Sequence, residues 1–430
     1  MADQNRHLIV LSADAMVDAD LEYARTLPHI KKLLEKGSRV KHVESIYPSV
    51  TYPAHVTMSS GCWPEKTGIW ANEHLQPGVV HPEWIWFHDG VKCEDIFDAA
   101  KRNGLTTAAV FWPVTGNHKN IDYLVDEYWP QDENDTKEAC YKRSGTTDKV
   151  YDECVRPFID GVKIRTHPET DYMVIKIGAE MIRRYQPNVL LLHPADVDGA
   201  RHAKGLFGEH VDQTLRDTDM YLGWLMEAAE EAGIYDQTDI VLMSDHGQLK
   251  IERVMCLNVK LAEAGLITVG EDGSFVDWKA YVKSVGMSAH VYVKDKADEG
   301  AVKKLLDELL AEEVYGISAV LTREEAKEKF HLDGDFSFVV ETDGFTSFGD
   351  DWKRPLMRPF DRTDYRHGKA THGYMPQKGP QPIFIAMGPH VKQGVEIEKG
   401  LLVQGAPTMA AILGIDLPEA QGEPWREMVK

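Results

Sequence analysis

Five short apolar runs recur along the chain and predict buried β-strands. They cover residues 8–11, 107–111, 189–192, 240–243 and 383–386. Strands that are apolar along their whole length, without alternation, are typical of a sheet covered on both faces. Between them, residues 27–36 and 221–232 carry apolar positions three and four apart, which is the spacing of surface helices. The alternation predicts an α/β fold with a mostly parallel central sheet and helices on both faces.

The pattern changes between residues 251 and 365. A helix rich in Lys and Glu is expected at 301–313, between strand-like runs at 289–293 and 338–341. We interpret this segment as an inserted α+β cap. Residues 1–250 and 366–430 then form the first and last parts of a catalytic core, which suits a chain too long for one small core.

Composition narrows the choice of partner and compartment. The formal charge of -21 argues against a nucleic-acid polymer, which needs a basic surface. A small anionic substrate is still allowed if bound cations reverse the local field. The first apolar run is too short for a signal peptide or a membrane span, and the five cysteines include no CxxC pair. We therefore expect a cytoplasmic protein with reduced cysteines and no membrane partner, while its oligomeric state is unknown.

Acidic residues follow three of the predicted strands. Asp14 follows the first run, Asp196 and Asp198 follow the third, and Asp245 with His246 follows the fourth. Ligands of open α/β sheets bind beyond the carboxyl ends of the strands, so these side chains are expected to converge. Carboxylates that meet at one sheet edge repel one another unless a cation lies between them. The arrangement predicts a pair of divalent metal ions.

Spacing selects further ligands. Asp198 and His202 are four residues apart, which places both on one face of a helical turn, able to hold a single ion. His372 precedes the last predicted strand. Asp196 is a rival to Asp198, although its spacing to His202 is wrong for this arrangement. A single Asp after a strand is more often a turn or capping residue. Several such groups at successive strand ends favour metal binding.

Thr51 is the candidate nucleophile. It stands two residues before Pro53, at the start of a predicted helix, in the N-cap position with proline in the first turn. The free backbone N–H groups of a helix start suit an anion. The alternative is that Thr51 merely caps the helix. The predicted metal ligands favour the nucleophile.

Together these motifs resemble the alkaline phosphatase superfamily, and most of all its nucleotide pyrophosphatase/phosphodiesterase branch, nearly from end to end. Residues 61–69 are similar to that family's Gly-x-x-Pro-x-x-x-Gly-Ile segment, and Asn72 follows them. The resemblance implies an alkaline phosphatase-like fold, a threonine nucleophile at Thr51, and binding of a phosphoryl oxygen by Asn72. Two departures stand out: Arg201 replaces the family's Gly before the ligand His, and Ala54 stands where eukaryotic relatives often carry Asn.

The resemblance also implies two sets of metal ligands, with zinc as the usual ion. One ion would be held by Asp198, His202 and His372, and the other by Asp14, Asp245, His246 and the oxygen of Thr51.

The predicted function is hydrolysis of phosphate diesters through a covalent phosphothreonine. Tyr52 and His193 are candidates to line the substrate pocket, and the alternative for both is a packing role. Arg201 is expected to reach a phosphate oxygen and to shift preference toward monoesters. Alternatives are a phosphonate hydrolase acting on compounds like phosphonoacetate, a phosphomonoesterase of the same superfamily, and a metal-binding protein without turnover.

Overall fold

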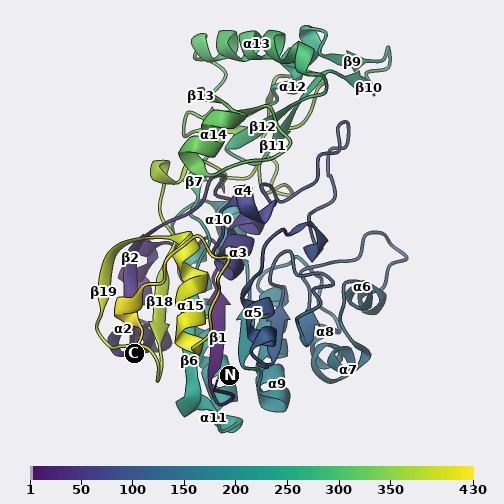
Figure 1. The fold of residues 1–430 in the computed structure, drawn as a ribbon. Coiled ribbons are helices and arrows are strands. Elements are labelled where there is room, and N and C mark those ends of the chain that lie inside the picture. Colours follow the sequence, from purple (N-terminus) through teal and green to yellow (C-terminus); the bar gives the residue numbers. More distant parts are fainter. Residues whose placement is uncertain (1–2) are drawn as a thin grey trace.

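An eight-stranded sheet forms the centre of the computed structural model, which describes residues 3–430 (Figure 1). The strand order is β19-β2-β18-β6-β1-β5-β3-β4. The strands are β1 (His7–Ser12), β2 (Ser38–Glu44), β3 (Thr107–Val110), β4 (Tyr123–Val125), β5 (Val189–Leu192), β6 (Thr238–Met243), β18 (Phe384–Met387) and β19 (Glu396–Leu401). Every neighbouring pair is parallel except those of β18 with β6 and β2. The mostly parallel sheet is therefore confirmed.

Strands β2 and β19 were not predicted, because they lie at one side of the sheet and mix buried residues with more exposed ones. In β2 the buried residues are separated by half-buried or exposed ones, and most of β19 is exposed or half-buried. The five predicted runs coincide with the fully buried strands β1, β3, β5, β6 and β18. A continuous apolar run thus found the middle of the sheet and missed its margin.

Two hydrophobic cores cover the two faces of the sheet. In β1, Ile9 and Leu11 point to one face, and Leu8 and Val10 to the other, as the period of two requires. The first face packs against α2 (Pro28–Lys36), α9 (Glu169–Tyr185) and α11 (Glu209–Glu231). The second packs against α3 (Thr51–Ser60), α5 (Ile96–Arg102) and α15 (Gly405–Leu413). Each fully buried side chain of this size contributes about 1.5–3 kcal/mol to stability.

A second unit with its own hydrophobic cluster lies above one end of the large sheet (Figure 1). Its antiparallel sheet has the order β11-β12-β14-β13, formed by β11 (Ala280–Ser284), β12 (Ser288–Val293), β14 (Phe338–Thr342) and β13 (Ile317–Thr322). The predicted helix 301–313 is α13 (Glu299–Ala311), and α2 and α11 contain the two other predicted helices. The exact limits of the cap at 251 and 365 stay a prediction.

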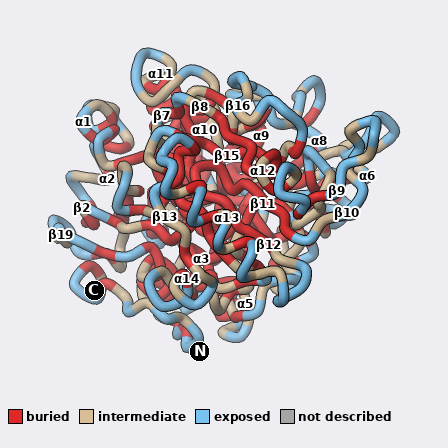
Figure 2. The backbone as a smooth tube through the Cα atoms, turned by 90° about the horizontal axis from the view of Figure 1, so that it is seen from above, coloured by how far each residue is buried: buried red, intermediate tan, exposed pale blue. Residues whose placement is uncertain are grey.

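Smaller elements connect these units. Short helices are α1 (Leu21–Ala24), α4 (Pro64–Thr67), α6 (Lys137–Arg143), α7 (Asp148–Val150), α8 (Arg156–Ile159), α10 (Asp196–Lys204), α12 (Asn258–Glu263) and α14 (Arg323–Phe330). Short strands are β7 (Leu249–Lys250), β8 (Arg253–Met255), β9 (Ile267–Val269), β10 (Phe275–Trp278), β15 (Thr346–Phe348), β16 (Met357–Arg358) and β17 (Ala370–Thr371). Seen from above the second unit, buried backbone fills the middle of the molecule and the exposed loops surround it (Figure 2).

The reversed direction of β18 matters for the location of His372. Phe384 at the start of β18 pairs with Met243 at the end of β6, so the segment before β18 lies at the carboxyl edge of the parallel strands. This is why His372 precedes its strand, whereas the acidic residues follow theirs. Among residues 3–430 no helix combines the length and the apolar character needed to cross a bilayer. All five cysteines are free.

The turn from α2 into β2 depends on the absence of a side chain at Gly37. A Cβ there would collide with the backbone carbonyl oxygen of Ala386 in β18, and neither backbone can yield cheaply. We expect Gly37→Ala to lower the free energy of unfolding by about 1–3 kcal/mol, measured by urea denaturation. Gly300→Ala is the matched control, because Gly300 lies in α13 with nothing within 4 Å. That change should be neutral or stabilise by up to about 1 kcal/mol. Equal effects of the two substitutions would contradict the packing argument.

Candidate active site

The carboxyl edge of the sheet opens into a cleft of about 570 Å³. Seven residues predicted from the sequence line it, and they come from loops and helix starts that are far apart in the chain: Asp14, Thr51, Asn72, His193, Asp198, His202 and His372. Asp245 and His246 lie directly behind them, completely buried. The structure therefore brings the predicted acids, imidazoles and hydroxyl to one place.

Asp198, His202 and His372 form the first group of potential ligands, with ligand atoms all within 4.8 Å of one another. Helix α10 presents Asp198 and His202 on the same face. The His202 Nδ1–H donates to the Ala370 carbonyl at 2.7 Å, so the Nε2 atom carries a lone pair. That buried Nε2 lies 3.0 Å from Asp198 Oδ2 without a hydrogen-bond partner. Two tetrahedral zinc ligands at about 2.0 Å from the ion are about 3.3 Å apart, so this spacing fits two ligands of one ion.

Asp14, Asp245 and His246 form the second group, again within 4.8 Å. Asp245 Oδ1 accepts the backbone N–H groups of Ala15 at 3.1 Å and of His246 at 2.9 Å. These bonds leave Asp245 Oδ2 buried without a partner, 3.2 Å from His246 Nε2. Asp14 Oδ1 is also buried and unpartnered. Buried polar atoms in proteins nearly always have partners, so these two oxygens fit metal ligation.

The raised pKa values of Asp14 and Asp245 also indicate a bound cation. Burial and the neighbouring Asp198 carboxylate raise the pKa of Asp14 to about 7. Burial and the charge of Asp14 raise the pKa of Asp245 well above its usual range. Burial also acts to raise the pKa of Asp198, but the His202 and His372 charges outweigh it and lower that pKa to about 2. Buried acids that resist ionisation are stabilised in their charged form by a bound cation.

The two groups adjoin each other. The His246 ring stacks on the His372 ring with 4.1 Å between centroids. Ala15, next to Asp14, has a φ of 57°, in the left-handed region that costs a residue with a Cβ about 1–2 kcal/mol. This conformation lets the Ala15 N–H reach Asp245 while Asp14 faces the cleft. The strain is therefore tied to the geometry of the second group.

Thr51 does not cap its helix. The helix α3 begins at Thr51, its N-cap residue is Val50, and no side chain caps the end, so the predicted N-cap position is wrong by one residue. The Thr51 hydroxyl instead lies 3.1 Å from His246 Nε2. His55 supports this placement, because its Nδ1–H donates to the Thr51 carbonyl at 2.8 Å. The alternative of a purely capping Thr51 is thereby removed.

Asn72 and Tyr52 are joined by one hydrogen bond. The Tyr52 backbone N–H donates to Asn72 Oδ1 at 2.9 Å, which orients the side-chain amide of Asn72 in the wall of the cleft. The Tyr52 ring is fully buried and packs edge-on against Trp84 at 5.1 Å. Tyr52 is not part of the cleft lining, so its predicted contact with substrate is not supported by its position.

His193 lines the cleft, but both of its ring nitrogens face protein atoms. Its Nε2 lies 3.0 Å from Asp14 Oδ2, and its Nδ1–H donates to the Phe111 carbonyl at 3.2 Å. These contacts hold the Asp14 carboxylate with its other oxygen free. The structure thus gives His193 a positioning role toward Asp14 in place of the predicted contact with substrate.

The prediction that Arg201 reaches a phosphate oxygen is wrong. Its buried guanidinium pairs with Asp20 at 2.6 Å and donates to the carbonyls of Ala15 and Leu206. Arg201 is not part of the cleft lining. Its N–H groups instead hold the loop after β1. Asp196, the rival ligand, is also placed elsewhere: it accepts the Tyr221 hydroxyl at 2.9 Å and belongs to neither ligand group.

Two neighbours of the ligands were missed. The Gln248 side-chain amide donates to Asp198 Oδ1 and orients it. The Tyr365 ring stacks on His372 at 5.3 Å with 14° between the planes. Gln248 lies two residues after His246, which was a usable signal. Nothing in the sequence around Tyr365 indicates that this segment returns to the cleft.

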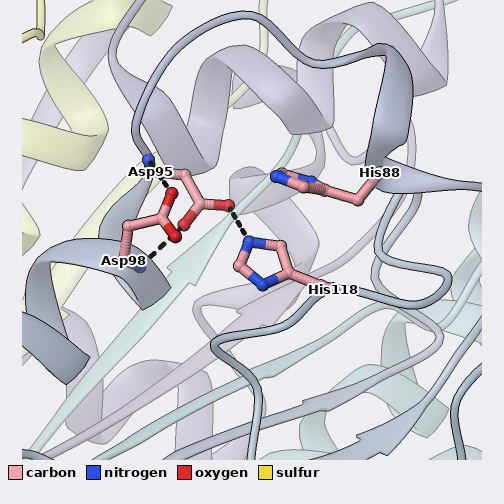
Figure 3. A group of neighbouring side chains, drawn as sticks. All are labelled: His88, Asp95, Asp98 and His118. Atoms are coloured by element: carbon pink, nitrogen blue, oxygen red, sulfur yellow. Dashed lines mark hydrogen bonds and ion pairs between the residues drawn. The ribbon is translucent and has the colours of Figure 1, made fainter.

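A third cluster, His88, Asp95, Asp98 and His118, also has ligand-type atoms within 4.8 Å (Figure 3). Its hydrogen bonds explain it without a cation. The Asn120 backbone N–H donates to His118 Nδ1 at 3.0 Å, so Nε2 carries the proton and donates to Asp95 Oδ2 at 3.2 Å. Asp95 Oδ1 caps α5 by accepting two backbone N–H groups. His118 has no lone pair left for a metal, and we assign the cluster a structural role.

The structure thus defines an α/β protein in which two adjoining groups of candidate metal ligands and a threonine hydroxyl lie at the carboxyl edge of the parallel strands. The chain belongs to the type I phosphodiesterase / nucleotide pyrophosphatase family, whose model matches residues 8–375. This confirms the resemblance inferred from the motifs.

Similar curated proteins include human ectonucleotide pyrophosphatase/phosphodiesterase family member 1, 25% identical over 265 residues, covering 58% of this chain and 24% of that protein. Venom phosphodiesterase 2 of Crotalus adamanteus is 23% identical over 409 residues, covering 91% of this chain and 43% of the venom protein. The chain therefore spans about a quarter of the length of the human relative and less than half of the length of the venom protein.

Among solved structures, murine ectonucleotide pyrophosphatase/phosphodiesterase 5, as an inactive Thr-to-Ala variant in complex with AMP, superposes with a TM-score of 0.69. The identity is 18%, and the match covers 99% of this chain and 100% of the other. The human counterpart gives a TM-score of 0.68 at 18% identity. These likenesses confirm the predicted fold.

The two ligand groups have buried atoms without partners, whereas the cluster around His118 is hydrogen-bonded. This difference predicts how many metal ions the protein binds. We expect the protein to hold two zinc ions per chain, measured by elemental analysis after dialysis against a zinc buffer. His202→Ala and Asp245→Ala should each lose one ion, because each removes a ligand from a different group. His88→Ala is the matched control and should retain both. A third ion that disappears in His88→Ala would refute the structural assignment of the cluster around His118.

Proposed function

We propose that the protein hydrolyses phosphate diesters, including nucleotide-type diesters and pyrophosphates, with Thr51 as nucleophile. One observation carries the proposal. The Thr51 hydroxyl is free of any capping bond and faces His246 Nε2 at 3.1 Å, inside a cleft whose floor is made of two adjoining ligand groups. A helix cap or a purely structural metal site would not need a hydroxyl in this position.

The ligand sets suit two divalent cations, with zinc as the first candidate because the donors are imidazole nitrogens and carboxylate oxygens. Asp198, His202 and His372 would hold one ion, and Asp14, Asp245, His246 and the Thr51 oxygen the other. When bound, such a pair supplies charge stabilisation for the attacking and leaving oxygens of an in-line displacement.

The chain's own residues then bind and orient the reacting groups. The backbone N–H of Thr51, at the first position of α3, is offered to a nonbridging oxygen of the scissile phosphate, since the N–H of Tyr52 already donates to Asn72 and Pro53 has none. The Asn72 amide, held through Tyr52, donates to the nonbridging oxygens as well. Thr51 attacks phosphorus and displaces the leaving alcohol or phosphate, and water then hydrolyses the phosphothreonine diester. His193 and Gln248 keep Asp14 and Asp198 in position throughout.

The relatives support this assignment. Several are named phosphodiesterases or nucleotide pyrophosphatases, and a structural neighbour is described as an inactive Thr-to-Ala variant in complex with AMP. A small anionic phosphoester is the substrate class that agrees with these names. We further propose a cytoplasmic location without a membrane partner.

Thr51→Ala should abolish turnover of bis-p-nitrophenyl phosphate, by at least about 10³-fold in kcat, because it removes the hydroxyl that faces His246 Nε2 in the cleft. Bound metal should stay at the wild-type level, measured by elemental analysis on the same sample. Thr51→Ser keeps the hydroxyl and should retain measurable activity. Loss of metal together with activity would point to a structural role for Thr51.

Substrate comparison separates the proposed reaction from its alternatives. We expect kcat/KM for bis-p-nitrophenyl phosphate to exceed that for p-nitrophenyl phosphate, because Arg201, the cation expected to favour monoesters, is tied to Asp20 and takes no part in the cleft. Phosphonoacetate should be a poor substrate, as measured by the release of inorganic phosphate. Preference for phosphonoacetate would replace the proposal, and inactivity of fully metallated protein on all three compounds would favour a binding protein.

A further inference from the structure

Three basic side chains line the active-site cleft without a charged partner. They are Lys163, Arg165 and Arg362, all exposed to solvent. Within residues 3–430, none of the three side chains forms a salt bridge or a hydrogen bond to the protein. In a chain with 69 acidic and 48 basic residues, surface cations have many carboxylates to pair with. Three unpaired cations on one cleft therefore call for an explanation.

Acidic residues of the same cleft are already engaged. Asp171 pairs with His167 at 2.6 Å, and Asp14 pairs with His193 at 3.0 Å. Glu127 Oε2 lies 3.7 Å from His193 Nδ1. These acids are thus neutralised in part by histidines, and the three cations keep their charge available to a ligand.

Arg165 is held in place by aromatic rings. Its guanidinium carbon lies 4.5 Å from the Trp129 ring centroid and 5.3 Å from the Trp84 centroid. Stacking occupies the face of the guanidinium and leaves the N–H groups at its edge free to donate. Arg165 also has a φ of 65°, a left-handed conformation that residues with a Cβ rarely adopt. Backbone strain of this kind concentrates at ligand-binding positions.

The three cations that line the cleft come from two distant segments. Lys163 and Arg165 belong to the connection between α8 and α9, and Arg362 belongs to the segment after β16 that leads to Tyr365 and His372. The cations are exposed, whereas Asp14 and His372 are almost completely buried. The cleft therefore has a floor of metal-ligand type and an outer wall that carries positive charge.

We propose that Lys163, Arg165 and Arg362 form an anion subsite for a second phosphate of the substrate, one that is not cleaved. The inference rests on the proposed function and assigns residues to its specificity: these three side chains would favour those diesters or phosphoanhydrides that bear a further phosphate. That phosphate can belong to the leaving group or to the part retained on Thr51, and both have the same chemistry of recognition by Lys and Arg.

Matched substrates separate these cases. Thymidine 5'-(p-nitrophenyl phosphate) with and without a 3'-phosphate tests a charge on the retained part, and ATP tests a charge on the leaving group. The triple variant Lys163→Ala, Arg165→Ala, Arg362→Ala should lose at least tenfold in kcat/KM for one of the charged substrates. Bis-p-nitrophenyl phosphate, which has no second anion, should change less than twofold. Raising the NaCl concentration should reduce the wild-type preference and leave the variant unaffected.

Controls keep the test decisive. Lys304→Ala removes an exposed cation that pairs with Glu308 on α13, outside the cleft, and should leave all rates unchanged. Thermal unfolding checks that the triple variant is folded. An equal loss on charged and uncharged substrates, or no loss on either charged substrate, would overturn the subsite. If wild-type protein cleaves no diester, the proposed function fails, and calorimetric binding of pyrophosphate by wild type and triple variant still decides on the subsite.

Discussion

The mutual repulsion of buried carboxylates is the constraint on which the site depends. Asp14 and Asp198 line one cleft with Asp245 buried behind them, and the pKa values of Asp14 and Asp245 are raised because burial and neighbouring carboxylates disfavour their charge. A fold tolerates such a concentration of acid only if something cationic compensates it. The unpartnered oxygens of Asp14 and Asp245 and the lone pair of His202 all lie where a cation would be bound. The rest of the site keeps these atoms available.

The need to keep these ligand atoms available explains several features of the site. His193 holds one oxygen of Asp14, Gln248 holds one oxygen of Asp198, and the strained backbone at Ala15 supplies a donor to Asp245. In each case a neutral or positive donor engages one carboxylate oxygen and leaves the other free. This is how surrounding hydrogen bonds orient metal ligands in general.

Proximity alone does not identify such a site. The cluster around His118 satisfies the same distance criterion as the two ligand groups, yet the central imidazole of His118 has no lone pair left for a cation. The difference lies in which ring nitrogen of the histidine carries the proton. A carbonyl behind His202 forces the proton onto Nδ1 and frees Nε2, whereas a backbone N–H behind His118 forces the proton onto Nε2. The second neighbour of an imidazole thus decides whether it can bind a metal.

The sequence by itself determined the sheet, the identity of the paired acids and histidines, and the family, because buried strands are continuously apolar and ligand-type residues follow their ends. It did not determine what each neighbouring polar residue does. Arg201, predicted to bind phosphate, is held by Asp20, and Tyr52 is buried against Trp84. Tyr365 stacks on the ring of His372, a contact that no motif around Tyr365 indicates. Such contacts depend on long-range packing and on which donor reaches which acceptor, and no local pattern in the chain encodes either.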